Sequence, residues 1–329
     1  MTAATGRALI LGDIEGIVGV DDWRQIFPGG AGYAAACADY AADVNAAVRG
    51  LLAGGATEVL VIDTHAAGTN LAGQELVGCR AIDGPSMLGR IDAAFAGGVD
   101  ALVLLGFHAA AGTVDGFVPH SFAPATRSWI DGELAGEPAF YALMAGARGV
   151  PTTLITGDSQ TIAQLTPFAP GVHAVQTKTS HSPWSATSAE PSTARAAIER
   201  TAADAFRHRT AIAPSTRPAM TLTVEAQNDV AATLIAGVPG MVRRDDRTST
   251  YSGRWPELWH AFVTANSLAA LAAAAGGSWY FGAIEGSLVE RLSAAVGSEA
   301  AFTASGGYFA ALFSPPWGPA CPPEFLPGA

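Results

Sequence analysis

The chain has 329 residues, of which 49% are hydrophobic and 14% are charged, and its formal net charge is −11. This composition supports a full hydrophobic core and argues against disorder, while the length allows one large domain or two modest ones. The acidic balance argues against a nucleic-acid partner, because phosphate binding needs a basic surface, and it is compatible with carboxylates gathered to hold cations.

Apolar runs alternate with alanine-rich segments in the first half of the chain. The continuous apolar runs predict buried strands at 8–13, 58–65, 101–108 and 151–157, with a further short strand within 75–83. The segments between them predict helices at 33–53 and 86–96, each followed by a glycine pair. Buried strands separated by helices predict an α/β fold, a mostly parallel sheet with helices on both faces.

The second half is predicted to add a smaller α+β part. An Asp131-Gly132 turn predicts a hairpin within 122–136, and a helix at 189–208 should follow a loop rich in Ser, Thr and Pro. Beyond Arg217-Pro218 the sequence predicts a strand at 220–226, a helix at 227–236, strand and turn at 240–253, and a helix at 256–275. We therefore expect an α/β metal-binding catalytic domain at 1–215. The rest, 216–329, is expected to serve oligomerisation or substrate shaping, with an extra tail from about 276.

Cysteine usage and the N-terminal segment predict a cytoplasmic protein. The three cysteines form no CxxC pair, which favours a reducing compartment without disulfides. The first ten residues lack the basic and apolar regions of a signal peptide. The uncharged stretch 261–284 contains Asn266, Ser267 and a glycine pair, so we interpret it as a buried helix and expect no contact with a membrane.

Potential metal ligands stand at the ends of three predicted strands. Asp13 and Glu15 follow the first strand, His65 ends the second and His108 ends the third. Because the carboxyl ends of parallel strands share one edge of a sheet, these side chains should converge on one crevice. Any one of them alone is more often an ordinary polar residue. Together, mixed nitrogen and oxygen ligands suit zinc, manganese, iron or nickel, and one more carboxylate would make a two-metal site.

The segments GDIEGI, IDTH, GFHA, PHS and GEPAFYALMAG, in this order, resemble the motifs of the binuclear zinc D-aminopeptidases associated with dipeptide-transport operons. The resemblance runs from about residue 8 to 275. It implies two Zn²⁺ ions per chain, with other divalent transition metals as possible substitutes, and a small peptide or amide as substrate. It also implies a large ring-like homo-oligomer, such as a decamer, with active sites facing an inner chamber.

Carried over to this sequence, the resemblance implies five metal ligands and one catalytic histidine. The implied metal ligands are Asp13, Glu15, His65, His108 and Glu137, with Asp13 as the bridge between the two ions. His120, in Pro119-His120-Ser121, matches the catalytic histidine, and its role as acid, base or oxyanion stabiliser stays open.

Two glutamates compete for the last ligand position. Glu133 follows the Asp131-Gly132 turn and is expected in the hairpin. Glu137 precedes a predicted helix, as in the family's Gly-Glu motif, and Pro138 suits the first turn of that helix. We therefore choose Glu137, although its spacing from His120 is one residue shorter than in the family pattern.

Four other polar residues near the motifs have open roles. Asp63 could orient His65 or cap a local turn. Asp158 could belong to the site or cap the helix that follows it. Lys178 could contact substrate or lie at the surface, and His181 has no counterpart in the family and is left out of the site.

The predicted function is a metal-dependent hydrolase, an aminopeptidase for short peptides or amides that contain D-amino acids. The segment 181–191 and the tail depart from the family pattern, so an amidase for another small amide or an L-peptide is one alternative. A non-catalytic α/β binding protein is the other. A two-metal phosphoesterase would need additional Arg or Lys beside the motifs, where none stands, and no GxSxG motif supports a serine hydrolase.

Overall fold

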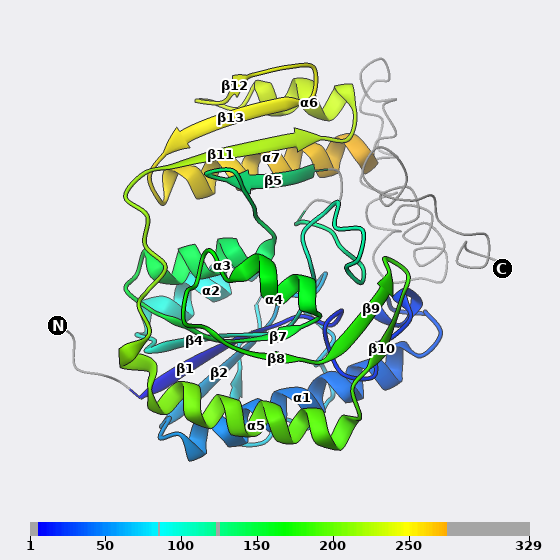
Figure 1. The fold of residues 1–329 in the computed structure, drawn as a ribbon, viewed down its shortest axis with the longest axis vertical. Coiled ribbons are helices and arrows are strands. Elements are labelled where there is room, and N and C mark those ends of the chain that lie inside the picture. The colour runs from blue at the N-terminus through cyan, green and yellow to red at the C-terminus, as the bar shows by residue number, and fades with distance from the viewer. Residues whose placement is uncertain (1–5, 85, 123–125, 275–329) are drawn as a thin grey trace.

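The computed structural model describes residues 6–84, 86–122 and 126–274. Its central feature is a six-stranded parallel sheet in the order β3-β2-β1-β4-β7-β8 (Figure 1). The strands are β1 (Arg7–Gly12), β2 (Glu58–Asp63), β3 (Arg80–Ala81), β4 (Ala101–Phe107), β7 (Thr152–Gly157) and β8 (His173–Gln176). The predicted α/β fold is thus confirmed.

Helices cover both faces of the parallel sheet (Figure 1). One face carries α1 (Tyr33–Ala53) and α5 (Pro191–Arg207), and the other carries α2 (Met87–Ala96), α3 (Glu137–Gly146) and α4 (Ser159–Leu165). Successive residues of β1 point to opposite faces, so Leu9 packs in the core beside α2 and α3 while Ile10 packs beside α1 and α5. Both faces are therefore apolar, which explains the continuous hydrophobic runs of the sequence.

A second, five-stranded antiparallel sheet has the order β12-β13-β11-β5-β6. Its elements, with the helices that pack on it, are β5 (Thr126–Ile130), β6 (Glu133–Leu134), β11 (Met220–Ala226), α6 (Asp229–Ala236), β12 (Val242–Arg243), β13 (Thr248–Gly253) and α7 (Glu257–Ala274). The predicted hairpin is confirmed, since Asp131 and Gly132 have φ values of 54° and 88° between β5 and β6. This sheet pairs β5 with β11, so it takes strands from both sides of the division that we predict at residue 215.

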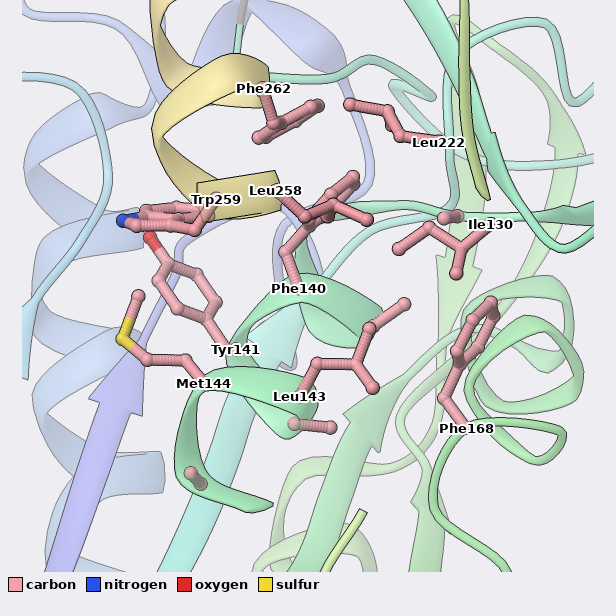
Figure 2. Close-up of a cluster of buried hydrophobic side chains, with 14 of the residues drawn as sticks. Ile130, Phe140, Tyr141, Leu143, Met144, Phe168, Leu222, Leu258, Trp259 and Phe262 are labelled. Atoms are coloured by element: carbon pink, nitrogen blue, oxygen red, sulfur yellow. The ribbon is translucent and has the colours of Figure 1, made fainter. Parts of the chain in front are cut away.

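Helix α3 lies between the two sheets, in the larger hydrophobic core (Figure 2). Every residue of this helix is buried. The ring of Phe140 stacks on Phe262 of α7, with 3.6 Å between centroids, and Leu143 lies in the same cluster as Leu222 of β11. Because α3 begins at Glu137, this packing sets where that carboxylate stands.

The segment predicted as a loop before 189 contains strands, so that expectation is wrong. β9 (Lys178–Ser182) and β10 (Ser185–Ser188) form a hairpin, and β8 lies at the edge of the parallel sheet. These strands are short and polar, and their burial alternates residue by residue, so no apolar run announces them. Two 3₁₀ helices, η1 (Trp23–Ile26) and η2 (Arg209–Ala211), complete the described elements.

The predicted buried helix near the C-terminal end is α7, which closes the described part of the chain at Ala274. Within the described residues, none of the helices combines the length and apolar character that crossing a membrane requires. The tail predicted from about residue 276 lies outside the described residues.

Candidate metal centre

The carboxyl edge of the parallel sheet carries the candidate site. The strand order reverses between β1 and β4, and in open α/β sheets ligands bind in the crevice beside such a reversal. Asp13 follows β1, His108 follows β4, and His65 follows β2, the other neighbour of β1. All three side chains are buried.

The segment Asp13–Val20, which we call the ligand loop, lies tightly against β4. The backbone NH of Asp13 donates to the Leu105 carbonyl at 2.8 Å, and the NH of Gly16 donates to the Gly106 carbonyl at 2.7 Å. A Cβ atom at Gly16 would lie only 2.2 Å from the Phe107 carbonyl oxygen. Glycine is therefore required there, which gives the second glycine of GDIEG its structural reason.

Asp13 stands between two groups of potential ligands. Its Oδ1 lies 3.2 Å from His65 Nδ1, and its Oδ2 lies 3.4 Å from His108 Nε2. The possible ligand atoms within each group lie within 4.8 Å of one another, and the groups are Asp13, Glu15 and His65, and His108, His120 and Glu137. One carboxylate therefore faces both groups, each oxygen turned to a different imidazole.

Backbone carbonyls set the orientation of all three imidazoles. His65 Nε2 lies 2.9 Å from the Ile26 carbonyl, His108 Nδ1 lies 2.9 Å from the Ala109 carbonyl, and His120 Nδ1 lies 2.8 Å from the Val118 carbonyl. A carbonyl only accepts, so each of these nitrogens donates its proton and the other nitrogen faces the carboxylates. This is how ligating histidines are usually held in metal sites. The rings of His108 and His120 also stack, 3.8 Å apart.

The second glutamate of the site is Glu137. Its Oε1 lies 3.6 Å from His108 Nε2, and its side chain enters the site from the first turn of α3. Glu133 is exposed in the β5–β6 hairpin.

Several atoms of the site are buried and have no hydrogen-bond partner among the residues that the structure describes. Both carboxylate oxygens of Glu15 and Nε2 of His108 belong to this class. Glu15 Oε1 lies 3.1 Å from His65 Nδ1, but without the alignment of a hydrogen bond. Buried polar and charged groups in such a state cost free energy unless something else satisfies them. A divalent cation with oxygen and nitrogen ligands fits this donor set, so these residues could hold a metal.

The charges of the site perturb its histidines in opposite directions. Burial disfavours the charged form of His65, but Glu15 and Asp13 outweigh it and raise the pKa of His65 well above its usual range. Burial also opposes charge on His108, whose pKa Glu137 and Asp13 raise to about 10. For His120, burial and the neighbouring His108 lower the pKa to about 4. The field that draws protons to two imidazoles would equally draw a cation, which competes for the same lone pairs.

The four residues with open roles lie outside the two groups. Asp63 accepts hydrogen bonds from the backbone NH groups of His65 and Asn70, so it shapes the turn after β2. Asp158 caps α4 and also accepts from the backbone NH of Phe117. His181 is exposed, with its Nε2 lying 2.8 Å from the Thr187 hydroxyl.

The position of Lys178 differs from both expectations from the sequence, a contact with substrate or a place at the surface. It is 2% exposed, and its Nζ donates to the backbone carbonyl of Glu15 at 2.5 Å. Burial lowers the pKa of Lys178 to about 8. The contacts of the three histidines with the carbonyls of Ile26, Ala109 and Val118 could not be predicted either, because every residue type has a backbone carbonyl.

Comparisons with known proteins agree with the motifs. A family model described as D-aminopeptidase, peptidase family M55, matches residues 7–264. The D-aminopeptidase of Bacillus subtilis (strain 168) is 27% identical over 212 residues, which cover 63% of this chain and 76% of that protein. The solved structure of the zinc-dependent D-aminopeptidase DppA from Bacillus subtilis, described as a self-compartmentalizing protease, matches with a TM-score of 0.72 and 24% identity. That match covers 80% of this chain and 97% of the other, and it shows a shared fold. The resemblance seen in the sequence is thus confirmed, and the chain belongs to peptidase family M55, the D-aminopeptidases.

Proposed function

We propose that this protein is a zinc-dependent aminopeptidase with two zinc ions per chain, and that it releases the first residue of short peptides or amides that begin with a D-amino acid. The observation that carries the proposal is the position of Asp13 between two ligand groups that contain buried atoms without hydrogen-bond partners. Membership of the D-aminopeptidase family supports the reaction, and the zinc dependence of the matched Bacillus subtilis enzyme supports the metal.

The proposal assigns three ligands to each ion. Asp13, Glu15 and His65 would hold one ion, and Asp13, His108 and Glu137 would hold the other. When bound, zinc supplies Lewis acidity and lowers the pKa of a water molecule toward neutrality.

His120 is proposed to move the proton. Its Nδ1 is committed to the Val118 carbonyl, so the Nε2 lone pair faces the site, 3.9 Å from Glu15 Oε1. A neutral imidazole in this orientation can take a proton from the attacking water and return it to the leaving amine. Its stacking on His108 holds the plane of the ring.

The proposed centre favours substrates with a free amino terminus. Two zinc ions would more than neutralise the buried carboxylates of Asp13, Glu15 and Glu137, so the acidic charge of these residues would not select the substrate. One of the ions could instead hold the neutral α-amino group of a peptide. Membership of the D-aminopeptidase family supports an aminopeptidase over a two-metal phosphoesterase.

A substrate panel tests the proposal. Purified protein loaded with zinc should hydrolyse D-aminoacyl amides and D-aminoacyl dipeptides faster than their L-enantiomers, and it should leave a phosphodiester intact. Glu137→Gln should abolish turnover, while Glu133→Gln, its exposed neighbour on the hairpin, serves as the matched control. Faster turnover of the L-series would overturn the proposed stereochemistry, and turnover of the phosphodiester alone would overturn the reaction. Zinc binding without turnover of any amide would identify a binding protein.

We further propose that the chain forms a homo-oligomer, a ring-like decamer. The support is the self-compartmentalizing character attributed to the matched DppA, together with the shared fold. Sedimentation velocity of the purified full chain tests this, with the proposal expecting a single large species near ten chains. A monomer at micromolar concentration would contradict it.

A further inference from the structure

We propose that Lys178 is a positioning residue, which holds the ligand loop from behind and thereby fixes the direction of Glu15. This inference rests on the proposed two-zinc centre. It concerns a residue that belongs to neither ligand group and stands 163 positions away from Glu15 in the sequence.

The contacts of Lys178 are made with the ligand loop. Its Nζ donates to the carbonyl of Glu15 at 2.5 Å and to the carbonyl of Val20. The ammonium also lies 4.8 Å from the centroid of the Phe117 ring. One charge therefore ties the middle of the ligand loop to its end. The preceding residue, Thr177, adds a hydrogen bond of 2.6 Å from its hydroxyl to the carbonyl of Gly16.

The cost of burying this ammonium indicates a specific role. Within the described residues no carboxylate lies within ion-pair distance of its Nζ, and its charge is met by carbonyl dipoles, an aromatic face and more distant carboxylates such as Asp21 and Asp158. Taking a charged group out of water costs several kcal/mol, and an apolar side chain would fill the same space more cheaply. A buried lysine used in this way is explained if the loop geometry depends on it.

The composition of the chain makes the choice of lysine specific. Lys178 is the only lysine among the 18 basic residues of the sequence, and all the others are arginines. A compact ammonium can donate to several carbonyls in different directions, whereas a planar guanidinium is a larger fork suited to carboxylates. The one lysine of the sequence thus stands where two backbone carbonyls converge on its buried Nζ.

Glu15 depends on these backbone contacts because its side chain is weakly held. Within the described residues neither carboxylate oxygen accepts an aligned hydrogen bond, and the contact of Oε1 with His65 Nδ1 is 3.1 Å long, so the backbone is the main restraint on the direction of the side chain. The backbone at Glu15 is held by Lys178 on its carbonyl, and the next residue, Gly16, is held against β4. Removing the ammonium should therefore loosen Glu15 while leaving His108 and Glu137 in place.

The first test compares Lys178→Met with the wild-type protein. Methionine retains most of the length of the side chain but has no charge and no donor. We expect one of the two zinc ions to bind about 10- to 100-fold more weakly, as is typical when a partner of a metal ligand is removed, and the other to bind as before. Lys178→Arg should restore little of this affinity. Ile235→Ala, in the core on α6, is the matched control, because it lowers stability in the other hydrophobic cluster, which contains no residue of the ligand loop.

The second test needs no substitution. Because the chain has one lysine, protein labelled with ¹³C- and ¹⁵N-lysine gives a single side-chain ammonium resonance. We expect this resonance to show slow proton exchange and to shift when zinc is added to the metal-free protein. An unshifted resonance, or a Lys178→Met variant that binds both ions with wild-type affinity, would overturn the inference. Failure of the wild-type protein to bind two ions would instead overturn the proposed function.

Discussion

The sharpest consequence of the proposed centre is a difference between two neighbouring carboxylates. Asp13 faces both ligand groups, and Glu15 belongs to one of them. Asp13→Asn and Glu15→Gln keep the shape of each side chain and remove its charge. We expect Asp13→Asn to weaken the binding of both zinc ions and Glu15→Gln to weaken the binding of only one.

The magnitude follows from sharing the binding free energy among the ligands. A four-ligand zinc site binds with about 10–16 kcal/mol, so one ligand contributes roughly 2.5–4 kcal/mol, or about 60- to 700-fold in affinity. For Asp13→Asn this factor applies to each ion, because each group faces one of its oxygens. For Glu15→Gln it applies to one.

The assay is zinc content after equilibrium dialysis against a series of buffered zinc concentrations. The wild-type protein should hold two ions per chain, Glu15→Gln should hold one at concentrations that saturate the wild type, and Asp13→Asn should hold neither. Glu133→Gln, which changes an exposed carboxylate on the hairpin, should behave as wild type. If Asp13→Asn and Glu15→Gln lost the same single ion, Asp13 would not be a bridge and the two-group interpretation would fail.

Four further outcomes are expected. His120→Gln should lower kcat by about 100- to 10,000-fold with zinc content unchanged, and a parallel loss of zinc would show that His120 is a ligand instead. Zinc affinity should rise with pH near neutrality, because the pKa of His108 is raised to about 10 and zinc must displace that proton; calorimetry in buffers of different ionisation enthalpy should detect proton release, and its absence would contradict the raised pKa. Gly16→Ala should weaken zinc binding, because its Cβ would lie 2.2 Å from the Phe107 carbonyl; unchanged binding would mean that the loop can move away from β4 at little cost. Phe140→Ala should lower the free energy of unfolding by about 3–5 kcal/mol, measured by denaturant titration, and a loss below 1 kcal/mol would show that the stack with Phe262 contributes little.

The sequence allowed prediction of the features that repeat a strong local pattern. The long strands of the parallel sheet are continuous apolar runs, and the carboxyl ends of these strands led directly to Asp13, His65 and His108. Glu137 was separable from Glu133 because a proline and an apolar helix follow it. In the same way, the Asp131-Gly132 dipeptide predicted the β5–β6 hairpin, because these residue types favour a tight turn.

Other features escaped prediction because they depend on contacts between distant segments. The β9–β10 hairpin is short and polar, so neither helical nor strand periodicity marks it. The burial of Lys178 follows from the docking of that hairpin on the ligand loop, which no local pattern encodes. The pairing of β5 with β11 likewise joins segments about 90 residues apart.

The position of α3 between the two sheets has a consequence for the order in which the site is assembled. Asp13, Glu15 and His65 come from the first 65 residues and can meet once β1, β2 and β4 have paired. Glu137 begins helix α3, and α7 packs on that helix through the stack of Phe140 on Phe262. The packing that positions Glu137 is therefore complete only when the residues near Phe262 have been synthesised and folded. We therefore expect the two ligand groups to form one after the other as the chain is synthesised, the Glu15 group first and the Glu137 group last.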